Sequence, residues 1–176
     1  MHRRGCEMRS VAPMKAMIPH QGDATIRRLR VDDMFIASLE FLGSHHFLWT
    51  HLSRLISGLS DRIHGAPFCL FHESGGRNQR IECCIPVRPF SGNDEIRTRM
   101  LPGASMLTWV HHGPYQAIGE SWEQLFDYIE SRNIRTNGPR REVYLGVHSA
   151  DGRIMSAELQ VPLLDIDEFD LLQNFI

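Results

Sequence analysis

The feature that most constrains the fold is a repeated order of sequence patterns along the chain. In each half, two strand-like segments precede an amphipathic segment with helical spacing, and two further strand-like segments follow it. The first half contains these segments at 24–31, 34–43, 44–65, 66–73 and 80–87. The second half contains them at 95–103, 104–113, 114–133, 140–147 and 156–163. The sequence therefore predicts one β-β-α-β-β unit that occurs twice.

Matching residues at corresponding places support an internal duplication. The segment 82–87, ECCIPV, has its counterpart in 158–163, ELQVPL, with a proline at the same place in both. Glycines flank both predicted helices in the same order, as Gly43 and Gly65 and then as Gly113 and Gly138. We therefore expect an α+β fold in which two duplicated units are related by a pseudo-twofold axis. Their strands would form one antiparallel curved sheet or barrel, with both helices on one face, flanking a central cleft.

Each predicted helix has an apolar stripe with the spacing of an α-helix. Ser44 precedes the first helix as a candidate cap, and Pro114 stands at the start of the second. The first stripe consists of Leu48, Leu52, Leu55, Ile56 and Leu59. The second consists of Ile118, Trp122, Leu125, Phe126 and Ile129. Both stripes are expected to pack on the sheet.

The bulk composition is that of a globular domain and excludes several functions. The 176 residues are 42% hydrophobic and 23% charged, which is enough for one domain with a core. A formal net charge of −2 gives no broad basic field for nucleic acid, and no apolar run approaches the ~20 residues of a membrane helix. We expect a flexible leader over 1–23, one domain over 24–164 and a tail over 165–176 that could form a short helix. The leader is too short for a helix-turn-helix unit, so we expect no direct DNA binding.

The cysteines and histidines do not have metal-ligand spacing. Cys6, Cys69, Cys83 and Cys84 form no CxxC pair, and Cys83 and Cys84 should point to opposite faces of one strand. Free thiols and a cytoplasmic protein are expected; the alternative is a secreted domain with disulfides. The pairs at 45–46 and 111–112 are adjacent histidines, more typical of solvated element ends than of a metal site. We expect neither a metal nor a cofactor.

Glu142 is the residue that most suggests a function. It lies on a predicted strand, and Tyr144, two residues on, shares its face. Overlaying the halves at Gly65 and Gly138 puts Cys69 opposite Glu142 and Phe71 opposite Tyr144, so the fold itself does not require a carboxylate at this place. From the residues alone, Glu142 could be solvated, paired with neighbouring arginines 140 or 141, or placed on the floor of a pocket.

Three segments of the second half resemble a known family. They are LPGASMLTWVHHGPYQAIGESWEQLFDYIE at 101–130, NGPRREVYLG at 137–146 and ELQVPL at 158–163. Together they resemble the GyrI-like domain, also called the AraC-type effector-binding domain, which forms the ligand-binding half of MerR-type multidrug regulators. The resemblance extends over roughly 24–164. It implies the duplicated fold inferred above.

The resemblance also implies a role for Glu142. In the family, a glutamate on the strand after the second helix lies at the bottom of an aromatic-lined cleft and attracts cationic, lipophilic ligands. Glu142 is the residue here that matches it. Aromatic faces would add cation–π attraction of ~0.5–2 kcal/mol each. The predicted ligand-binding residues are Glu142, Tyr144, Phe71, Cys69, Trp109, Tyr115 and Trp122.

Three functions follow from these observations, and the first is favoured. It is a stand-alone sensor or sequestering protein for a small cationic, aromatic molecule. The second is a hydrolase of strained, cyclopropane-bearing electrophiles, as in some relatives that this chain resembles. We find no convincing second catalytic group for it and assign no catalytic residue. The third is a protein-interaction module, as in gyrase-inhibiting relatives. A homodimer is compatible with the chain, and Glu40 could be a second pocket acid or an edge residue.

Overall fold

The computed structural model describes residues 26–72, 79–93, 95–147 and 154–164, and within them the protein is an α+β fold with eight strands and two α-helices. The first half contains β1 (Arg27–Val31), β2 (Met34–Gly43), α1 (Leu48–Leu59), β3 (Phe68–His72) and β4 (Gln79–Pro86). The second contains β5 (Arg97–Leu101), β6 (Ala104–Pro114), α2 (Ile118–Ser131), β7 (Arg140–Val147) and β8 (Ile154–Pro162). All eight predicted strands and both helices are confirmed. The predicted leader 1–23 and tail 165–176 lie outside the described residues.

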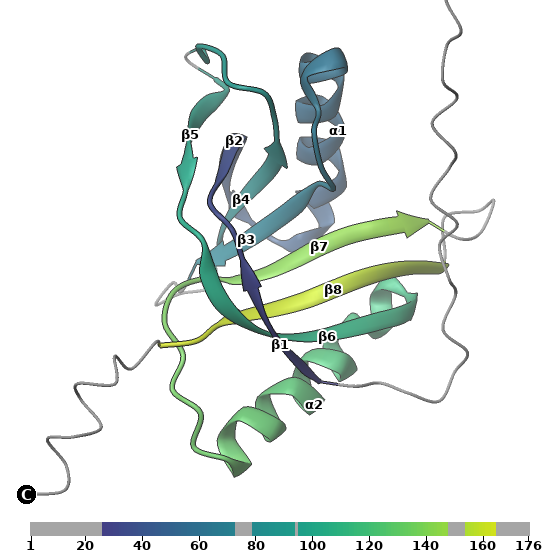
Figure 1. The fold of residues 1–176 in the computed structure, drawn as a ribbon. Helices are drawn as coiled ribbons and strands as arrows, with labels where there is room; N and C mark the ends of the chain where they lie inside the picture. The colour runs from purple at the N-terminus through teal and green to yellow at the C-terminus, as the bar shows by residue number, and fades with distance from the viewer. Residues whose placement is uncertain (1–25, 73–78, 94, 148–153, 165–176) are drawn as a thin grey trace, which may run out of the picture.

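The eight strands form one curled antiparallel sheet (Figure 1). Their order is β1-β6-β8-β7-β3-β4-β2-β5, so β3 and β7 lie at its centre, while β1 and β5 are its edges. This order is unchanged when every strand is exchanged for its counterpart in the other half and the sheet is viewed from the opposite edge. The topology thus has the symmetry that the predicted duplication requires.

The pairing registers agree with the same symmetry. Glu40 pairs with Glu82 between β2 and β4, and the corresponding pair between β6 and β8 is Val110 with Glu158. Both glutamates of the recurring ECCIPV and ELQVPL segments therefore hold the same place in their ladders. These registers support an internal duplication and let residues of the two halves be compared one by one.

At the centre of the sheet, Cys69 of β3 pairs directly with Glu142 of β7. The next positions along β3 and β7 pair with one another on either side, as Phe68 with Val143 and Leu70 with Arg141. A twofold axis that relates the two halves would pass between Cys69 and Glu142. The two residues predicted to be equivalent are thus neighbours across the middle of the sheet.

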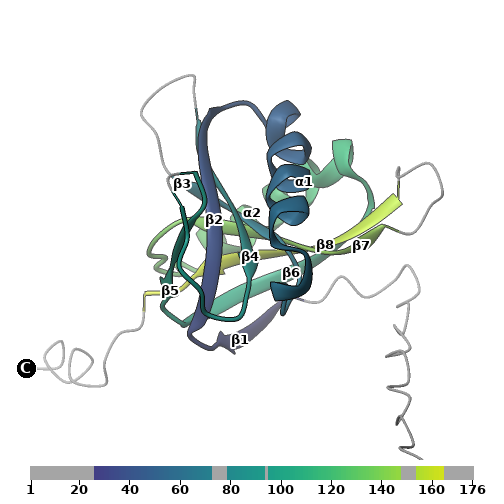
Figure 2. The ribbon, with the colours of Figure 1, turned by 90° about the horizontal axis from the view of Figure 1, so that it is seen from above.

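The two helices pack on one face of the sheet, each over the strands of its own half (Figures 1 and 2). Contacts to β2 and β4 hold α1, and contacts to β6 hold α2. Their buried side chains are Leu48, Leu52, Leu55, Leu59, Ile118, Trp122 and Leu125. Fully burying one such side chain stabilises the fold by ~1.5–3 kcal/mol. None of the helices in the described part of the chain is long and apolar enough to span a bilayer.

Three details of the helix predictions were wrong. Ile56 and Phe126 each remain 39% exposed, because they lie at the solvent-facing margin of the apolar stripes. Ser44 occupies the N-cap position of a short 3-10 turn before α1, yet its side chain makes no capping bond to the backbone. Its hydroxyl instead contacts the ring of His46 at 3.3 Å.

The sheet separates two apolar clusters. The main one lies between the sheet and the helices and contains Cys69, Phe71 and Tyr144 together with the helix stripes. A smaller one, on the opposite face, contains Ile36, Phe68, Leu70, Cys84 and Leu101. Because side chains alternate along a strand, Glu142 and Tyr144 face the helices while Arg141 and Val143 face away.

Candidate functional site

The Glu142 carboxylate is enclosed by aromatic hydrogen-bond donors. Its side chain is 1% exposed. The indole Nε1 of Trp122 donates to Oε1 at 2.8 Å, and the hydroxyls of Tyr144 and Tyr115 donate to Oε2 at 3.0 and 3.2 Å. These donors come from α2, from β7 and from the turn that precedes α2. We call these four residues the Glu142 cluster.

The two tyrosines keep their protons in this environment. Burial raises the pKa of Tyr115 and of Tyr144 well above the ordinary value for a phenol, and the charge of Glu142 raises both further. A protonated phenol can donate a hydrogen bond to the carboxylate, whereas a phenolate would repel it. The cluster therefore consists of one acidic group and three neutral donors.

The carboxylate lacks an ion-pair partner in the part of the chain that the structure describes. Glu142 is thus neither solvated nor paired with a neighbouring arginine, two of the placements that the sequence left open. Burying a carboxylate costs free energy that hydrogen bonds offset only in part, and a positive charge nearby would offset more of it.

Aromatic side chains from the first half of the chain complete the surroundings. The ring of Trp49, on α1, lies 4.9 Å from the ring of Tyr144 and 5.6 Å from that of Tyr115, as measured between centroids. His45 stacks on Phe71 at 5.0 Å. Trp49 is 39% exposed, so it covers the cluster on its solvent side.

The structure brings most of the predicted site residues together. Tyr115, Trp122 and Tyr144 contact Glu142, and Cys69 is its neighbour across the sheet. Phe71 lies two residues further along β3, so its side chain points to the same face as that of Cys69. Trp109 packs against the main core cluster, and the described residues give it no hydrogen bond or ring contact with the others.

Sequence reasoning missed three residues near Glu142, namely Trp49, His45 and Arg140. Trp49 lies beside the predicted apolar stripe of α1, where an exposed residue is expected. A signal was nevertheless present, because a large aromatic residue on the polar side of a helix is unusual unless something covers it. Arg140 shares the strand face of Glu142, two residues earlier, which the alternation of a strand predicts.

The cysteines are free thiols within the described residues. Cys69, Cys83 and Cys84 are buried, and the sulfurs of Cys69 and Cys83 lie 3.5 Å apart across β3 and β4. Burial raises the pKa of the Cys69 and Cys84 thiols, so both stay protonated. Cys6 lies outside the described residues. The predicted free thiols are confirmed for the three cysteines that the structure describes.

The histidine pairs are less solvated than predicted. His111 is 5% exposed; its Nδ1 contacts the hydroxyl of Ser121 at 2.9 Å and its Nε2 the carbonyl of Pro114 at 3.2 Å. It thereby ties the end of β6 to the first turns of α2. The adjacency that argued against a metal site also sends neighbouring side chains to opposite faces, which is why one histidine of the pair is buried.

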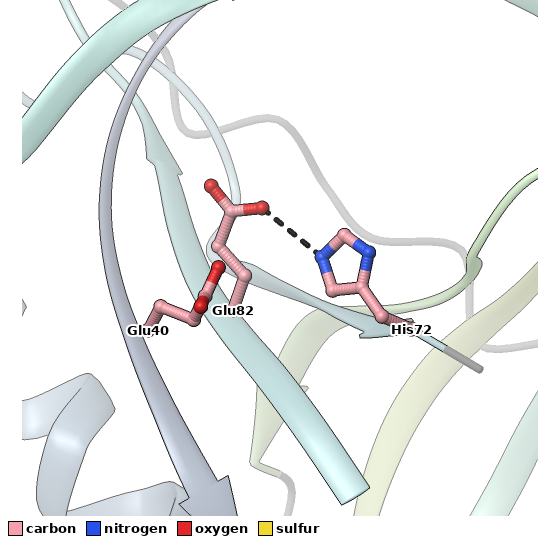
Figure 3. A group of neighbouring side chains, drawn as sticks. All are labelled: Glu40, His72 and Glu82. Carbon is pink, nitrogen blue, oxygen red and sulfur yellow. Dashed lines mark hydrogen bonds and ion pairs between the residues drawn. The ribbon is translucent and has the colours of Figure 1, made fainter. Parts of the chain in front are cut away.

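On the sheet face opposite Glu142, Glu40, His72 and Glu82 come together from three strands (Figure 3). Their candidate ligand atoms all lie within 4.8 Å of one another, which is close enough to hold a metal ion. Arg99, however, donates to both oxygens of Glu82 at 2.8 and 3.0 Å, and His72 contacts Glu82 at 3.3 Å. A metal ion would have to displace the guanidinium, so the donor set fits an internal ion network better.

This network accounts for Glu82, one of the two recurring glutamates, and places Glu40. Burial alone would raise the pKa of Glu82, but hydrogen bonds from Ser38 and Arg99 and the charge of Arg99 hold it below its ordinary value. The corresponding residue, Glu158, accepts a hydrogen bond from Gln160 at 2.6 Å. Glu40 lies beside Glu82 on β2, an interior strand of the sheet, and its side chain faces away from Glu142. Because β5 pairs only with Met34–Ser38 of β2, Glu40 has no strand neighbour on that side among the described residues and is locally an edge residue, and it is not a second acid of the Glu142 cluster.

Sequence comparison assigns the family. The model of the GyrI-like small molecule binding domain matches residues 66–164, more than half of the chain. The protein belongs to this family. The matched region includes the whole Glu142 cluster. No curated protein matches the chain.

Several solved structures share the fold. The C-terminal domain of EcmrR superposes with a TM-score of 0.69 at 19% identity, covering 81% of this chain and 98% of that domain. In the EcmrR–DNA complex, the match covers 58% of the longer EcmrR chain. SAV2435 bound to tetraphenylphosphonium matches at 0.60 and 11% identity, over 80% of this chain and 94% of that one. A hydrolase from Listeria innocua superposes with a TM-score of 0.53 at 13% identity, and the match covers 82% of this chain and 94% of that one.

Proposed function

We propose that the protein binds a small aromatic cation above the Glu142 cluster, as a sensor or sequestering module. The observation that carries this proposal is a carboxylate that is 1% exposed, has three neutral aromatic donors and lacks an ion pair among the described residues. A delocalised cation loses little hydration on entering such a place, and it gains from ring faces. The charge of Glu142 acts more strongly there than in water.

Two rings near the carboxylate are partly exposed. Trp49 and Phe126 are each 39% exposed, and Phe126 stacks on Trp122 at 5.4 Å. A flat or propeller-shaped aromatic ligand could replace the contact of Trp49 with Tyr115 and Tyr144. SAV2435, which shares the fold, has tetraphenylphosphonium bound. This compound class supplies a rational first probe.

The test compares two ligands of nearly the same shape and different charge. Methyltriphenylphosphonium is a cation, and triphenylphosphine oxide is its neutral counterpart, with oxygen in place of methyl. Titration calorimetry should show clear preference for the cation by the wild type. Glu142→Gln keeps the shape and polarity of the side chain. It should lower the affinity for the cation ten- to a hundredfold, ~1.5–3 kcal/mol, and lower the affinity for the oxide far less.

A matched control variant is available on the opposite sheet face. Glu82→Gln also removes a buried carboxylate, but one that faces away from the cluster, so cation affinity should stay within about twofold of the wild type. Circular dichroism checks that each variant is folded. If wild type binds neither compound, or if Glu142→Gln weakens both equally, the proposal is wrong.

The same purified protein can be tested for catalysis. The hydrolase alternative predicts that the protein hydrolyses a cyclopropane-bearing electrophile. Chromatography of the reaction mixture would detect the products. In the cluster, every group that contacts Glu142 is a donor, and none is a second base in contact with it. We therefore expect binding without turnover. Gyrase capture by the purified protein would test the interaction alternative.

A further inference from the structure

Arg140 places a second charge beside the Glu142 cluster. It lies two residues before Glu142 on β7 and pairs with Phe71 of β3, so both side chains share the face of Glu142. The guanidinium carbon lies 5.3 Å from the ring centre of Trp122, 5.6 Å from that of Phe71 and 5.8 Å from that of Phe126. The positively charged guanidinium of Arg140 thus lies among the aromatic rings that would contact the ligand.

The guanidinium is incompletely partnered. Its Nε atom is buried and has no hydrogen-bond partner among the described residues, nor does Arg140 form an ion pair there. Burial lowers the pKa of Arg140 and the charge of Glu142 raises it, yet a guanidinium stays charged in either case. A buried donor without an acceptor costs free energy, which an acceptor from a ligand would recover.

Arg140 also opposes a simple cation. A ligand with only positive charge would lie near both Glu142, which attracts it, and Arg140, which repels it. A ligand that carries an anionic group as well would satisfy both residues. Guanidinium groups match carboxylates in a two-pronged geometry, so a carboxylate is the natural partner.

From this placement we infer that the preferred ligand is zwitterionic, with an aromatic cation above Glu142 and a carboxylate bound by Arg140. The inference rests on the proposed function and narrows its ligand class. It makes Arg140 a specificity-determining residue.

The neighbouring residue Arg141 provides a matched control. Its Nε also lacks a partner among the described residues, but its side chain faces the opposite side of the sheet, 6.0 Å from the ring of Phe68. A substitution there removes a guanidinium from the same strand without touching the Glu142 face. An effect through charge on the strand as a whole would appear in both variants, whereas direct contact would appear only at Arg140.

The experiment uses carboxyethyl-triphenylphosphonium, a zwitterion at neutral pH, and its methyl ester, a cation with the same skeleton. By calorimetry the wild type should bind the zwitterion about tenfold more tightly than the ester. Arg140→Gln should abolish this ratio and bind the ester as well as or better than the wild type does. Arg140→Lys, which keeps the charge, should retain part of the ratio, and Arg141→Gln should retain all of it.

Two results would overturn the inference while leaving cation binding intact. One is a wild type that binds both compounds without preferring the zwitterion. The other is a preference that survives in Arg140→Gln. Should neither phosphonium compound bind the wild type, the proposed function itself fails, and the inference fails with it.

Discussion

The two halves of the protein build the same framework but differ in polarity at its centre. Their strands follow the same order and registers, and corresponding residues can be read from the ladders and from the starts of the helices. Around the axis the second half is polar and the first half is largely apolar. The corresponding pairs, with the second-half residue first, are Glu142 and Cys69, Tyr144 and Phe71, Trp122 and Leu52, Tyr115 and His45, and Arg140 and Pro67.

This difference indicates that Glu142 and its hydrogen-bond donors occur together. Tyr144 and Trp122 donate to Glu142, and the corresponding Phe71 and Leu52 have no group that could donate. The acceptor and these two donors are present together in one half and absent together in the other, whereas His45, the counterpart of Tyr115, keeps a polar ring. Since the first half folds around a thiol and apolar side chains, the fold itself does not need the carboxylate. This comparison supports the proposed role of Glu142 in binding.

The largest expected effect comes from giving the first half a carboxylate at the position that corresponds to Glu142. Cys69→Glu would place a second carboxylate directly opposite Glu142, where the described chain offers no ion pair for either. An uncompensated buried charge should lower the free energy of unfolding by ~3–5 kcal/mol. Urea denaturation measures the loss. Cys69→Ala is the control, at ~1 kcal/mol, and equal losses for the two variants would contradict the central placement.

A smaller change makes the second half resemble the first. Trp122→Leu copies Leu52; it removes the 2.8 Å bond to Glu142 and leaves a void beside Phe126. We expect a loss of ~2–4 kcal/mol in the free energy of unfolding, from the cavity and from the unpaired carboxylate oxygen. Thermal and urea unfolding should agree on this ranking. A loss below that of an ordinary exposed substitution would show that the indole contributes little.

Removing a single hydroxyl isolates one donor. Tyr144→Phe copies Phe71 and should cost ~1–3 kcal/mol of stability, because one of the two donors to Oε2 of Glu142 is lost. Tyr128, half-buried on α2 and outside the cluster, gives the matched control. Tyr128→Phe should change the free energy of unfolding by at most ~0.5 kcal/mol. Similar losses for both tyrosines would remove the distinction between cluster and surroundings.

Much of the framework could be predicted from the sequence, for reasons visible in particular residues. The strand alternation around Glu142 and Tyr144 sets their common face, and the glycine landmarks align Cys69 with Glu142. The donors from α2 and its preceding turn were named, but their convergence on one carboxylate required the helix position. Spacing within a strand or helix cannot supply that.

The remaining features depend on contacts between distant segments. Trp49 reaches Tyr115 and Tyr144 across the two halves, and no local pattern on α1 predicts this. Ser38, His72 and Arg99 converge on Glu82 from three strands, although only the recurrence of the glutamate was visible. Sequence reasoning thus found most of the residues whose place follows from local geometry, with Arg140 as an exception, and it missed residues such as Trp49 that the fold brings in from a distant segment.

The ion network on the opposite face predicts a pH dependence of stability. Because Arg99 and its neighbours hold the pKa of Glu82 below its ordinary 4.5, the native state binds this proton less readily than the unfolded chain does. The stability from Glu82 is therefore complete above about pH 4.5 and is lost as the pH falls through the lower pKa of the folded protein. Glu82→Gln should remove this part of the acid sensitivity, as urea midpoints from neutral to acidic pH would reveal. Identical acid profiles of variant and wild type would contradict it.

The smallest effect tests whether the two charges near the cluster act on the first half as the structure indicates. Burial lowers the pKa of His45 below 6.5; the charge of Glu142 raises it, and the charge of Arg140 lowers it. Glu142→Gln should therefore move the His45 pKa further down, and Arg140→Gln should move it up. Because the folded protein favours neutral His45, its contribution to stability is complete above about pH 6.5 and falls as the pH drops toward the lower folded value. Titration of the His45 ring signals by NMR measures both shifts. Opposite directions would place His45 in the field of both residues, whereas shifts in one direction would separate it from the Glu142 site.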